Sequence, residues 1–220
     1  SSTNTFELPA SETTTVAETT TLKGTNGATL KLRSTQDGTD ANFAIDKFKQ
    51  ELHNVDVKDV DASVSNTIYC VDNCTDSGNV SSKNFVFSVD ITFNKASDSG
   101  NEIDNKKFKV SLSEPYFTEP ITVDFLDNGL QATPQEDYTF ADGSLTIAQG
   151  DKSAYTSKLL TLDDKKEEGD EKLEINLDQI SSPSTSYYSN LNLGSTSTLT
   201  YTILANDEQD DSGGGGGGSI

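Results

Sequence analysis

From residue 84 onward, apolar side chains recur at every second position in one short segment after another. The first such series is Phe85, Phe87, Val89, Ile91 and Phe93. Further segments of this kind follow as far as residue 204, with turn-forming residues between them. A period of two is the repeat of a strand with one buried face, and many short strands joined by turns are typical of a sandwich. The sequence therefore predicts a mostly β chain built around an antiparallel β-sandwich.

The chain is strongly acidic, with a net charge of -20 and an isoelectric point of about 4.2. Nucleic acids and anionic membrane surfaces attract Lys and Arg, so we expect neither as a partner. Hydrophobic residues make up 32% of the sequence, which is enough for only a thin core. No run of 18 apolar residues indicates a membrane span. Two interpretations of the charge stay open: cation binding, or an acidic surface that keeps the protein soluble.

Acidic residues gather where the predicted strands end. The three groups are Glu136-Asp137, the segment from Asp163 to Glu171, and Asn206-Asp207-Glu208. Loops at one end of an antiparallel sandwich lie close together, so carboxylates from all three groups would repel one another unless a cation lay among them. Hard oxygen ligands on irregular loops suit Ca²⁺ better than Mg²⁺, which requires a strict octahedral geometry.

Residues 84 to 208 resemble the Calx-β repeat in the order and approximate spacing of several short segments. The segments are Val110-Ser111-Leu112-Ser113-Glu114-Pro115, Ile121-Thr122-Val123, Asp137-Tyr138, Gly143-Ser144-Leu145-Thr146-Ile147, Gly150, Asp163-Asp164, Gly169-Asp170-Glu171-Lys172-Leu173, Leu193-Gly194 and Thr202-Ile203. The resemblance implies an Ig-like sandwich. Modules of this family regulate sodium–calcium exchangers, occur in the integrin β4 tail, and repeat in large extracellular adhesins.

The resemblance also implies a set of calcium ligands. The positions that match the family's ligands are Asp137, Asp163, Asp164, Glu168 and Asp207. Weaker candidates are Asn206, Glu208 and Asp90, with Glu102 as an alternative to Asp90 for an early glutamate of the family. The sequence departs from the family pattern at Ala205, which has no ligand group, and at the neutral Asn206. One or two calcium sites are therefore expected instead of a full cluster. We interpret Glu171 as a solvated charge at a strand edge, where charges oppose aggregation.

Residues 1–83 form an extension or a small α+β lobe in this interpretation. Asp40 to His53 carries apolar side chains near helical spacing, at Phe43, Ile45, Phe48 and Leu52. Asp40 can cap the start, and basic residues follow towards the end. The sequence therefore predicts one short helix in this region.

The two cysteines, Cys70 and Cys74, have three residues between them. Zinc would need two further ligands, and redox motifs have two intervening residues. A local disulfide is the favoured reading, which implies an oxidising compartment, and two free thiols are the alternative. At the other end, residues 209–220 contain six consecutive glycines. They predict a flexible tether, either an added linker or a natural spacer.

The sequence contains no signature of catalysis. There is one histidine, His53, no tryptophan platform for sugars, and no phosphate-binding or nucleophile motif. We expect a non-enzymatic adhesion or structural module that is extracellular, on the cell surface or periplasmic, with calcium stiffening one loop end. Neighbouring domains, another surface protein or a glycan would be its further partners. The alternatives are an accessory or anchoring domain of a secreted enzyme, and a metal-free structural spacer.

Overall fold

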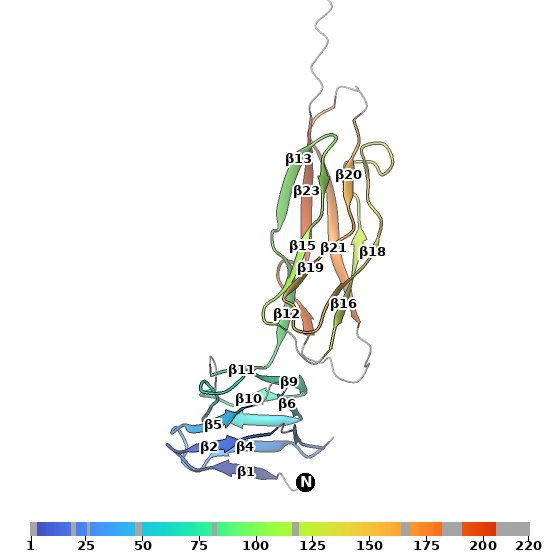
Figure 1. The fold of residues 1–220 in the computed structure, drawn as a ribbon. Coiled ribbons are helices and arrows are strands. Elements are labelled where there is room, and N and C mark those ends of the chain that lie inside the picture. The colour runs from blue at the N-terminus through green and yellow to red at the C-terminus, as the bar shows by residue number, and fades with distance from the viewer. Residues whose placement is uncertain are drawn as a thin grey trace, which may run out of the picture.

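The computed structural model describes residues 4–18, 21–25, 27–46, 50–80, 83–115, 119–163, 168–181 and 191–205. These residues form 23 strands and no helix, and so contain no helix that could cross a membrane. Their buried apolar side chains fall into two clusters, one mainly from residues 8–85 and one mainly from residues 89–203. Figure 1 shows the two parts stacked end to end. The boundary at residue 83 between two domains stays a prediction.

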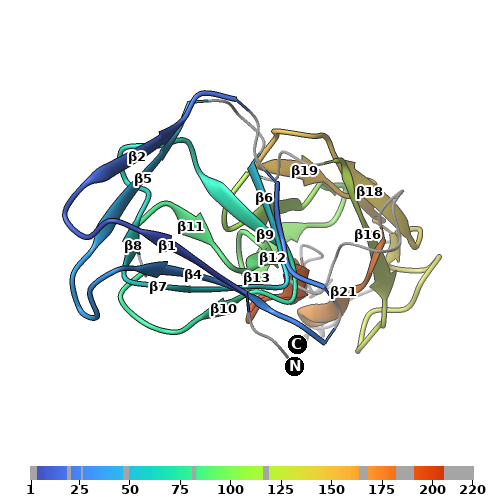
Figure 2. The same cartoon turned by 90° about the horizontal axis from the view of Figure 1, so that it is seen from below.

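The N-terminal part is a parallel β-solenoid, which we call the solenoid. Its strands are β1 (Thr5–Leu8), β2 (Thr13–Val16), β3 (Thr21–Lys23), β4 (Leu30–Ser34), β5 (Ala41–Ile45), β6 (Gln50–His53), β7 (Val55–Lys58), β8 (Val60–Asp61), β9 (Ile68–Asp72), β10 (Thr75–Asp76) and β11 (Phe85–Val86). They form three sheets, in the orders β1-β4-β7-β10, β2-β5-β8 and β11-β9-β6-β3. Every pairing among them is parallel. Viewed along the stack, the three sheets surround a common interior (Figure 2).

Period-two alternation explains why these segments are strands. In β5, Ala41, Phe43 and Ile45 are buried while the two residues between them are half-buried. Because each strand pairs in register with the strand one rung below it, buried side chains stack in columns. Leu32 lies beside Val57, for example. Each strand thus gains backbone hydrogen bonds and apolar burial together.

The predicted helix over Asp40 to His53 is wrong. Ala41–Ile45 and Gln50–His53 are β5 and β6, and residues 47–49, which include Phe48, lie outside the described residues. The buried set in β5 includes Ala41, which the helical spacing left out. Backbone hydrogen bonds to β2 and β8, strands from two other rungs, outweigh the local preference for a helix.

The disulfide between Cys70 and Cys74 is present, as predicted, with 5.8 Å between the two Cα atoms. It closes the turn between β9 and β10, where Asn73 adopts a positive φ of 46°. A small side chain that tolerates the left-handed region is suited to this position. The cross-link fixes one corner of the solenoid.

Asp59 fixes another corner, between β7 and β8. It is only 3% exposed and has a positive φ of 55°. Its carboxylate accepts hydrogen bonds from the Gly38 backbone amide at 2.9 Å and from Asn79 Nδ2 at 3.0 Å. The bond from Gly38, followed by that from Asn79 and the charge of Lys58, lowers the pKa of Asp59 despite the opposing effect of burial.

The C-terminal part is a β-sandwich, which we call the sandwich. Its strands are β12 (Val89–Phe93), β13 (Ser97–Asn101), β14 (Asn105–Lys106), β15 (Lys109–Leu112), β16 (Ile121–Asp127), β17 (Tyr138–Thr139), β18 (Gly143–Ile147), β19 (Ser153–Tyr155), β20 (Leu159–Thr161), β21 (Glu171–Ser181), β22 (Leu191–Leu193) and β23 (Thr198–Leu204). One layer is the sheet β13-β23-β21-β16-β18. The other consists of β19-β15-β12-β22 and β14-β20-β17.

These last two sheets continue one another across an interruption. The amide of Phe108 donates to Thr156 Oγ1 at 3.1 Å, and the amide of Thr156 donates to the Phe108 carbonyl at 3.0 Å. The two sandwich layers bury a common core, to which Tyr138, Tyr201 and Phe125 contribute the largest fully enclosed side chains.

The prediction of an antiparallel architecture is wrong for the chain as a whole. All pairings between the strands of the solenoid are parallel. Within the described part of the sandwich, β12 pairs with β22 and β13 pairs with β23 in parallel, while the other pairings are antiparallel. Alternation of apolar residues indicates which face of a strand is buried. It does not indicate whether the neighbouring strand runs parallel or antiparallel.

The solenoid and the sandwich meet at a short, packed junction. Only Phe87 and Ser88 separate β11 from β12. Tyr69 of β9 belongs to the core of the sandwich, and Val86 packs against that core. Phe85 and Phe87, whose ring centroids are 6.0 Å apart, pack in the solenoid core. The last rung of the solenoid therefore closes one end of the sandwich core.

Candidate metal centre

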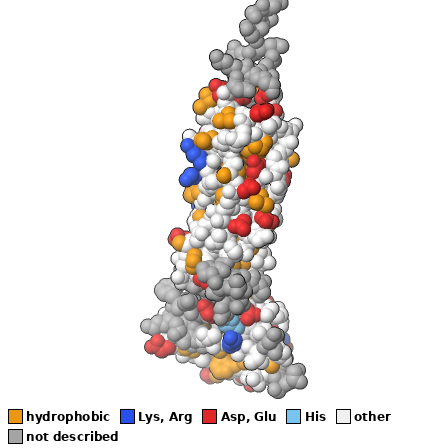
Figure 3. Space-filling model, turned by 90° about the vertical axis from the view of Figure 1, so that its right-hand side faces the viewer, with side chains coloured by type: hydrophobic (Ala, Val, Ile, Leu, Met, Phe, Trp, Pro, Cys, Tyr) orange, Lys and Arg blue, Asp and Glu red, His pale blue; other side chains and the backbone are white. Residues whose placement is uncertain are grey.

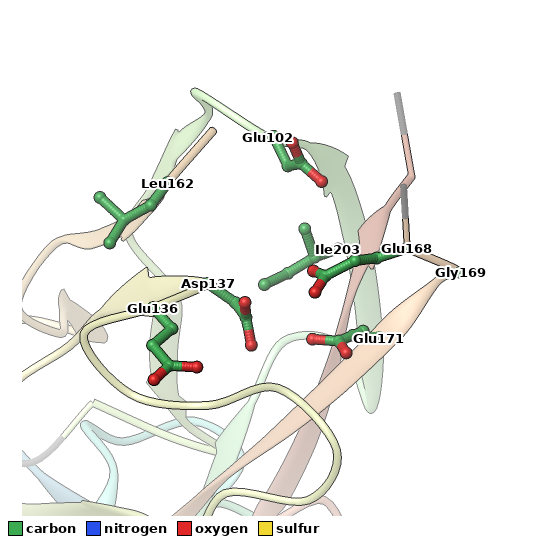
Figure 4. A pocket seen from close by; sticks show the side chains of 8 residues that line it. All are labelled: Glu102, Glu136, Asp137, Leu162, Glu168, Gly169, Glu171 and Ile203. Atoms are coloured by element: carbon green, nitrogen blue, oxygen red, sulfur yellow. The ribbon is translucent and has the colours of Figure 1, made fainter. Parts of the chain in front are cut away.

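Three carboxylates converge at the end of the sandwich that lies away from the solenoid. Asp137, Glu168 and Glu171 each offer an oxygen, and these oxygens all lie within 4.8 Å of one another. All three side chains are half-buried. Figure 4 shows them pointing into one space, with Glu102 nearby. We call these three residues the carboxylate cluster.

The core of the sandwich positions Asp137 through its neighbour. Tyr138 is fully buried, and its hydroxyl donates a 2.6 Å hydrogen bond to Asp127. Burial and the Asp127 carboxylate together raise the pKa of Tyr138 above its usual range. The Asp137 carboxylate accepts the Thr133 amide, and its backbone carbonyl accepts the Leu162 amide at 2.8 Å. Backbone and side chain of Asp137 are thus both held.

Glu171 is the first residue of β21, opposite Ile203 of β23. It shares the parity of Leu173 and Ile175, which are fully buried, and of Leu177. Since alternate residues of a strand point to the same face, Glu171 points towards the interior side of its sheet. The expectation that Glu171 is a solvated edge charge does not match this half-buried position. The spacing of two residues between Glu171 and Leu173 was the sequence signal that could have identified Glu171 as an inward-pointing side chain.

Glu168 lies just before β21, in a segment that is tied to the end of β23. The Asp170 carboxylate accepts a hydrogen bond from the Ala205 amide at 3.1 Å. Ala205, which has no ligand group of its own, thereby helps to place the segment that carries Glu168. Asp170 has a structural partner and lies outside the carboxylate cluster.

A tight turn between β13 and β14 brings Glu102 to the same space. Thr161, which is only 4% exposed, accepts the Asp104 amide at 2.7 Å and donates to the Asn101 carbonyl at 2.9 Å. Between Asn101 and Asp104, Ile103 has a positive φ of 66° and is 71% exposed. A β-branched residue in this region is strained, and such strain persists only where the surroundings enforce it. Here the Thr161 hydrogen bonds hold the turn.

The space between these side chains is large enough to hold one small cation. The cavity between these side chains has a volume of about 10 Å³, close to one water-sized sphere. Its lining is completed by Glu102, Glu136, Leu162, Gly169 and Ile203. Two unit charges 4.8 Å apart repel by about 0.9 kcal/mol in water and about 3.5 kcal/mol at an effective dielectric constant of 20. A divalent cation would convert this repulsion into attraction.

The structure unites only part of the predicted ligand set. Asp137 and Glu168 lie together, joined by Glu171 and with Glu102 beside them. Asp163 is exposed and outside the carboxylate cluster. Asp90 lies on β12, whereas the carboxylate cluster lies beyond β13 and β20 at the opposite end (Figure 1). The other candidates, Asp164, Asn206, Asp207 and Glu208, lie outside the described residues. A ligand role for any of these residues stays a prediction.

Comparison with known proteins finds partial structural similarity. CBD12 from CALX1.2 is 19% identical with a TM-score of 0.46, over 53% of this chain and 45% of that one. The calcium binding domain CBD12 of CALX1.1 is 18% identical with a TM-score of 0.46, over 54% and 46%. The Calx CBD2 domain is 14% identical with a TM-score of 0.42, over 55% and 87%. The match thus spans less than half of each CBD12 chain. No family model and no curated protein matches the sequence.

Proposed function

We propose that the sandwich is a non-catalytic module that binds one calcium ion at the carboxylate cluster. The observation that carries the proposal is the convergence of three carboxylates within 4.8 Å. They come from two separate segments, the loop before β17 and the start of β21. Neither segment brings more than two of these charges by itself, so the fold assembles the site.

The chemistry of the donors favours calcium over other common metals. Carboxylate oxygens on loops, partly open to water, suit a hard cation with a flexible coordination sphere, and waters would fill the remaining positions. Mg²⁺ requires shorter and stricter geometry. Zn²⁺ prefers His and Cys, but His53 lies in the solenoid and both cysteines form the disulfide.

Calcium would act by linkage to folding. The ion binds only when the Asp137 loop and the start of β21 are both in place, so binding stabilises the folded sandwich. At a concentration one hundred times the dissociation constant, this stabilisation is about 2.7 kcal/mol. Without calcium, repulsion within the carboxylate cluster loosens the same end of the sandwich. The functional consequence is a loop end that calcium makes stiff.

The proposed role is that of an adhesion or structural module that is extracellular, on the cell surface or periplasmic. The disulfide supports this location, because such bonds persist in oxidising compartments. The net charge of -20 supports a partner other than nucleic acid. Neighbouring domains or another surface molecule would be held by the calcium-stiffened end.

Isothermal titration calorimetry on the full chain tests the proposal. We expect one calcium per chain, weaker binding of Mg²⁺, and a rise in melting temperature with calcium concentration. Glu168→Gln should reduce calcium affinity. The matched control is Asp178→Asn, which removes an exposed charge from β21 outside the carboxylate cluster. Absence of calcium binding, together with an unmoved melting curve, would contradict the proposal and favour a metal-free spacer.

A further inference from the structure

A second cavity lies where the chain crosses from one layer of the sandwich to the other. After Phe93 the chain leaves β12 and enters β13 in the opposite sheet. The Asn94 amide donates to the Lys109 carbonyl at 3.0 Å, and the Thr200 amide donates to the Ala96 carbonyl at 2.9 Å. The neighbouring sheet is interrupted at residues 107–108. The crossing and the interruption together leave a cavity of about 150 Å³.

The walls of this cavity are of two kinds. Phe108 and Leu199, 4% and 2% exposed, belong to the core of the sandwich and supply apolar surface. Three lysines and one acid, Lys95, Lys107, Lys109 and Asp98, supply charge. On either side of the buried Phe108, Lys107 is exposed and Lys109 is half-buried.

This collection of positive charge is unusual for the chain. Only 16 of its residues are Lys or Arg, against 36 Asp or Glu, and three of the 16 line one cavity. Lys95 lies 3.5 Å from Asp98. Among the described residues, neither Lys107 nor Lys109 forms an ion pair. Figure 3 shows Lys and Arg side chains gathered on one edge of the sandwich, while acidic side chains are spread along the rest of this face.

An exposed aromatic ring lies beside this charge. Tyr155 of β19 pairs directly across from Lys109 of β15, so both side chains are on the same face of the sheet. Cβ atoms of such cross-strand partners are about 5 Å apart. Tyr155 is 57% exposed although it is a large aromatic side chain. An exposed ring next to a cationic cavity offers a flat surface on which the C–H face of a sugar can stack.

We propose that this cavity is a binding site for an acidic sugar residue, a hexuronate. Its carboxylate would meet Lys95, Lys107 and Lys109 in the cavity. Its ring would extend out of the cavity towards Tyr155, which is the cross-strand partner of Lys109 and does not itself line the cavity. The volume of about 150 Å³ is enough for one small ligand and excludes a folded partner.

The acidic surroundings do not prevent this binding. Asp98 is the one acid that lines the cavity, and the carboxylate cluster lies beyond the other end of β13. Glu102 follows Asp98 by four residues, which is about 13 Å along an extended chain. At physiological salt the screening length is about 8 Å, so repulsion from that end is weak. The sugar site and the calcium site are therefore independent.

Calorimetry or ligand-observed NMR with D-glucuronate and the full chain tests the site, with glucose as the neutral control. We expect glucuronate to bind, glucose to bind at least tenfold more weakly, and glucuronate affinity to fall as salt rises. Lys107→Ser should weaken binding about threefold, and Asp98→Asn should strengthen it about threefold, since charge contacts at exposed sites contribute modestly. Equal binding by a polyuronate chain would show that the same chemistry is recognised within a polymer.

Lys152→Ser is the matched control, because Lys152 is an exposed lysine outside the cavity, 4.0 Å from Glu114. It should leave glucuronate affinity unchanged. Melting curves of all variants should coincide, which separates lost binding from lost folding. The proposal is overturned if glucuronate fails to bind at about 10 mM, a concentration that would detect even millimolar affinity. It is also overturned if Lys152→Ser weakens binding as much as Lys107→Ser, because binding would then follow net charge alone.

Discussion

Replacing Glu171 by Gln should stabilise the protein without calcium and weaken its response to calcium. The variant removes one charge of the carboxylate cluster, and with it two of the three pairwise repulsions. At 4.8 Å each is worth about 0.9 kcal/mol in water, and screening at physiological salt reduces it by about half. In chelator we therefore expect the variant to be more stable than the parent by about 1 kcal/mol, which is about 2 to 4 °C in melting temperature for a chain of this size.

The second half of the prediction concerns calcium. Loss of one charged ligand that weakens calcium affinity tenfold reduces the stabilisation from about 2.7 kcal/mol to about 1.4 kcal/mol, at a concentration that is one hundred times the parent dissociation constant. Urea unfolding followed by circular dichroism, with chelator and with calcium, measures both quantities. The two effects have opposite signs, so a general loss of folding cannot imitate them.

Asp178→Asn is the control for Glu171→Gln, since it removes an exposed charge from the same strand. It should change stability by less than about 0.5 kcal/mol in either condition. The reasoning would be refuted if Glu171→Gln were neutral or destabilising in chelator, because the cluster would then carry no repulsion. An unchanged calcium increment would equally refute it, because Glu171 would then not face the ion.

Three further predictions concern the scaffold. Tyr138→Phe removes the hydrogen bond to Asp127 without leaving a cavity, and should lower the free energy of unfolding by about 1 to 2 kcal/mol in urea titrations; an unchanged midpoint would contradict this. Because the folded-state pKa of Asp59 lies below 3.8, its contribution to stability is complete above that pH and is lost as pH falls through the folded value. Asp59→Asn should therefore be less stable than the parent near neutral pH, with the gap closing in acid; a gap that persists at the lowest pH would count against the assignment. Reduction of the Cys70–Cys74 disulfide should cost about 2 kcal/mol by the loop-entropy relation, measured as the unfolding midpoint with and without reductant, and no shift would show that the cross-link is not stabilising.

The sandwich was largely predictable because its strands follow one local rule. Alternation marks the buried faces of β12, β16 and β23, and the same alternation continues to Glu171, where it indicates an inward-pointing charge. The carboxylate cluster was predictable only in part. Glu168 and Asp137 follow from the motif order, whereas the exposed position of Asp163 depends on how the chain leaves β20. That departure is set by tertiary hydrogen bonds such as that from the Leu162 amide.

The solenoid was missed for a physical reason. Its strands are two to five residues long, which is too short to separate a period of two from a period of 3.6. Within Asp40 to His53, a spacing of two between Phe43 and Ile45 lies beside a spacing of four between Phe48 and Leu52. Stacking of rungs, which decides between the two, joins residues far apart in sequence, such as Thr5 with Lys31 and Lys31 with Asp56. No local pattern reports such pairings.

The two-residue connection between β11 and β12 has a mechanical consequence. A flexible linker would let two bodies swing and would absorb a pull as extension. Here Tyr69 of the solenoid is embedded in the core of the sandwich. A force applied to the solenoid is therefore transmitted directly to the backbone hydrogen bonds of the sandwich. The solenoid and the sandwich should behave under tension as one continuous rod. Apart from the extension of the glycine-rich residues 209–220, a force-extension trace should show no compliant phase before the first unfolding event.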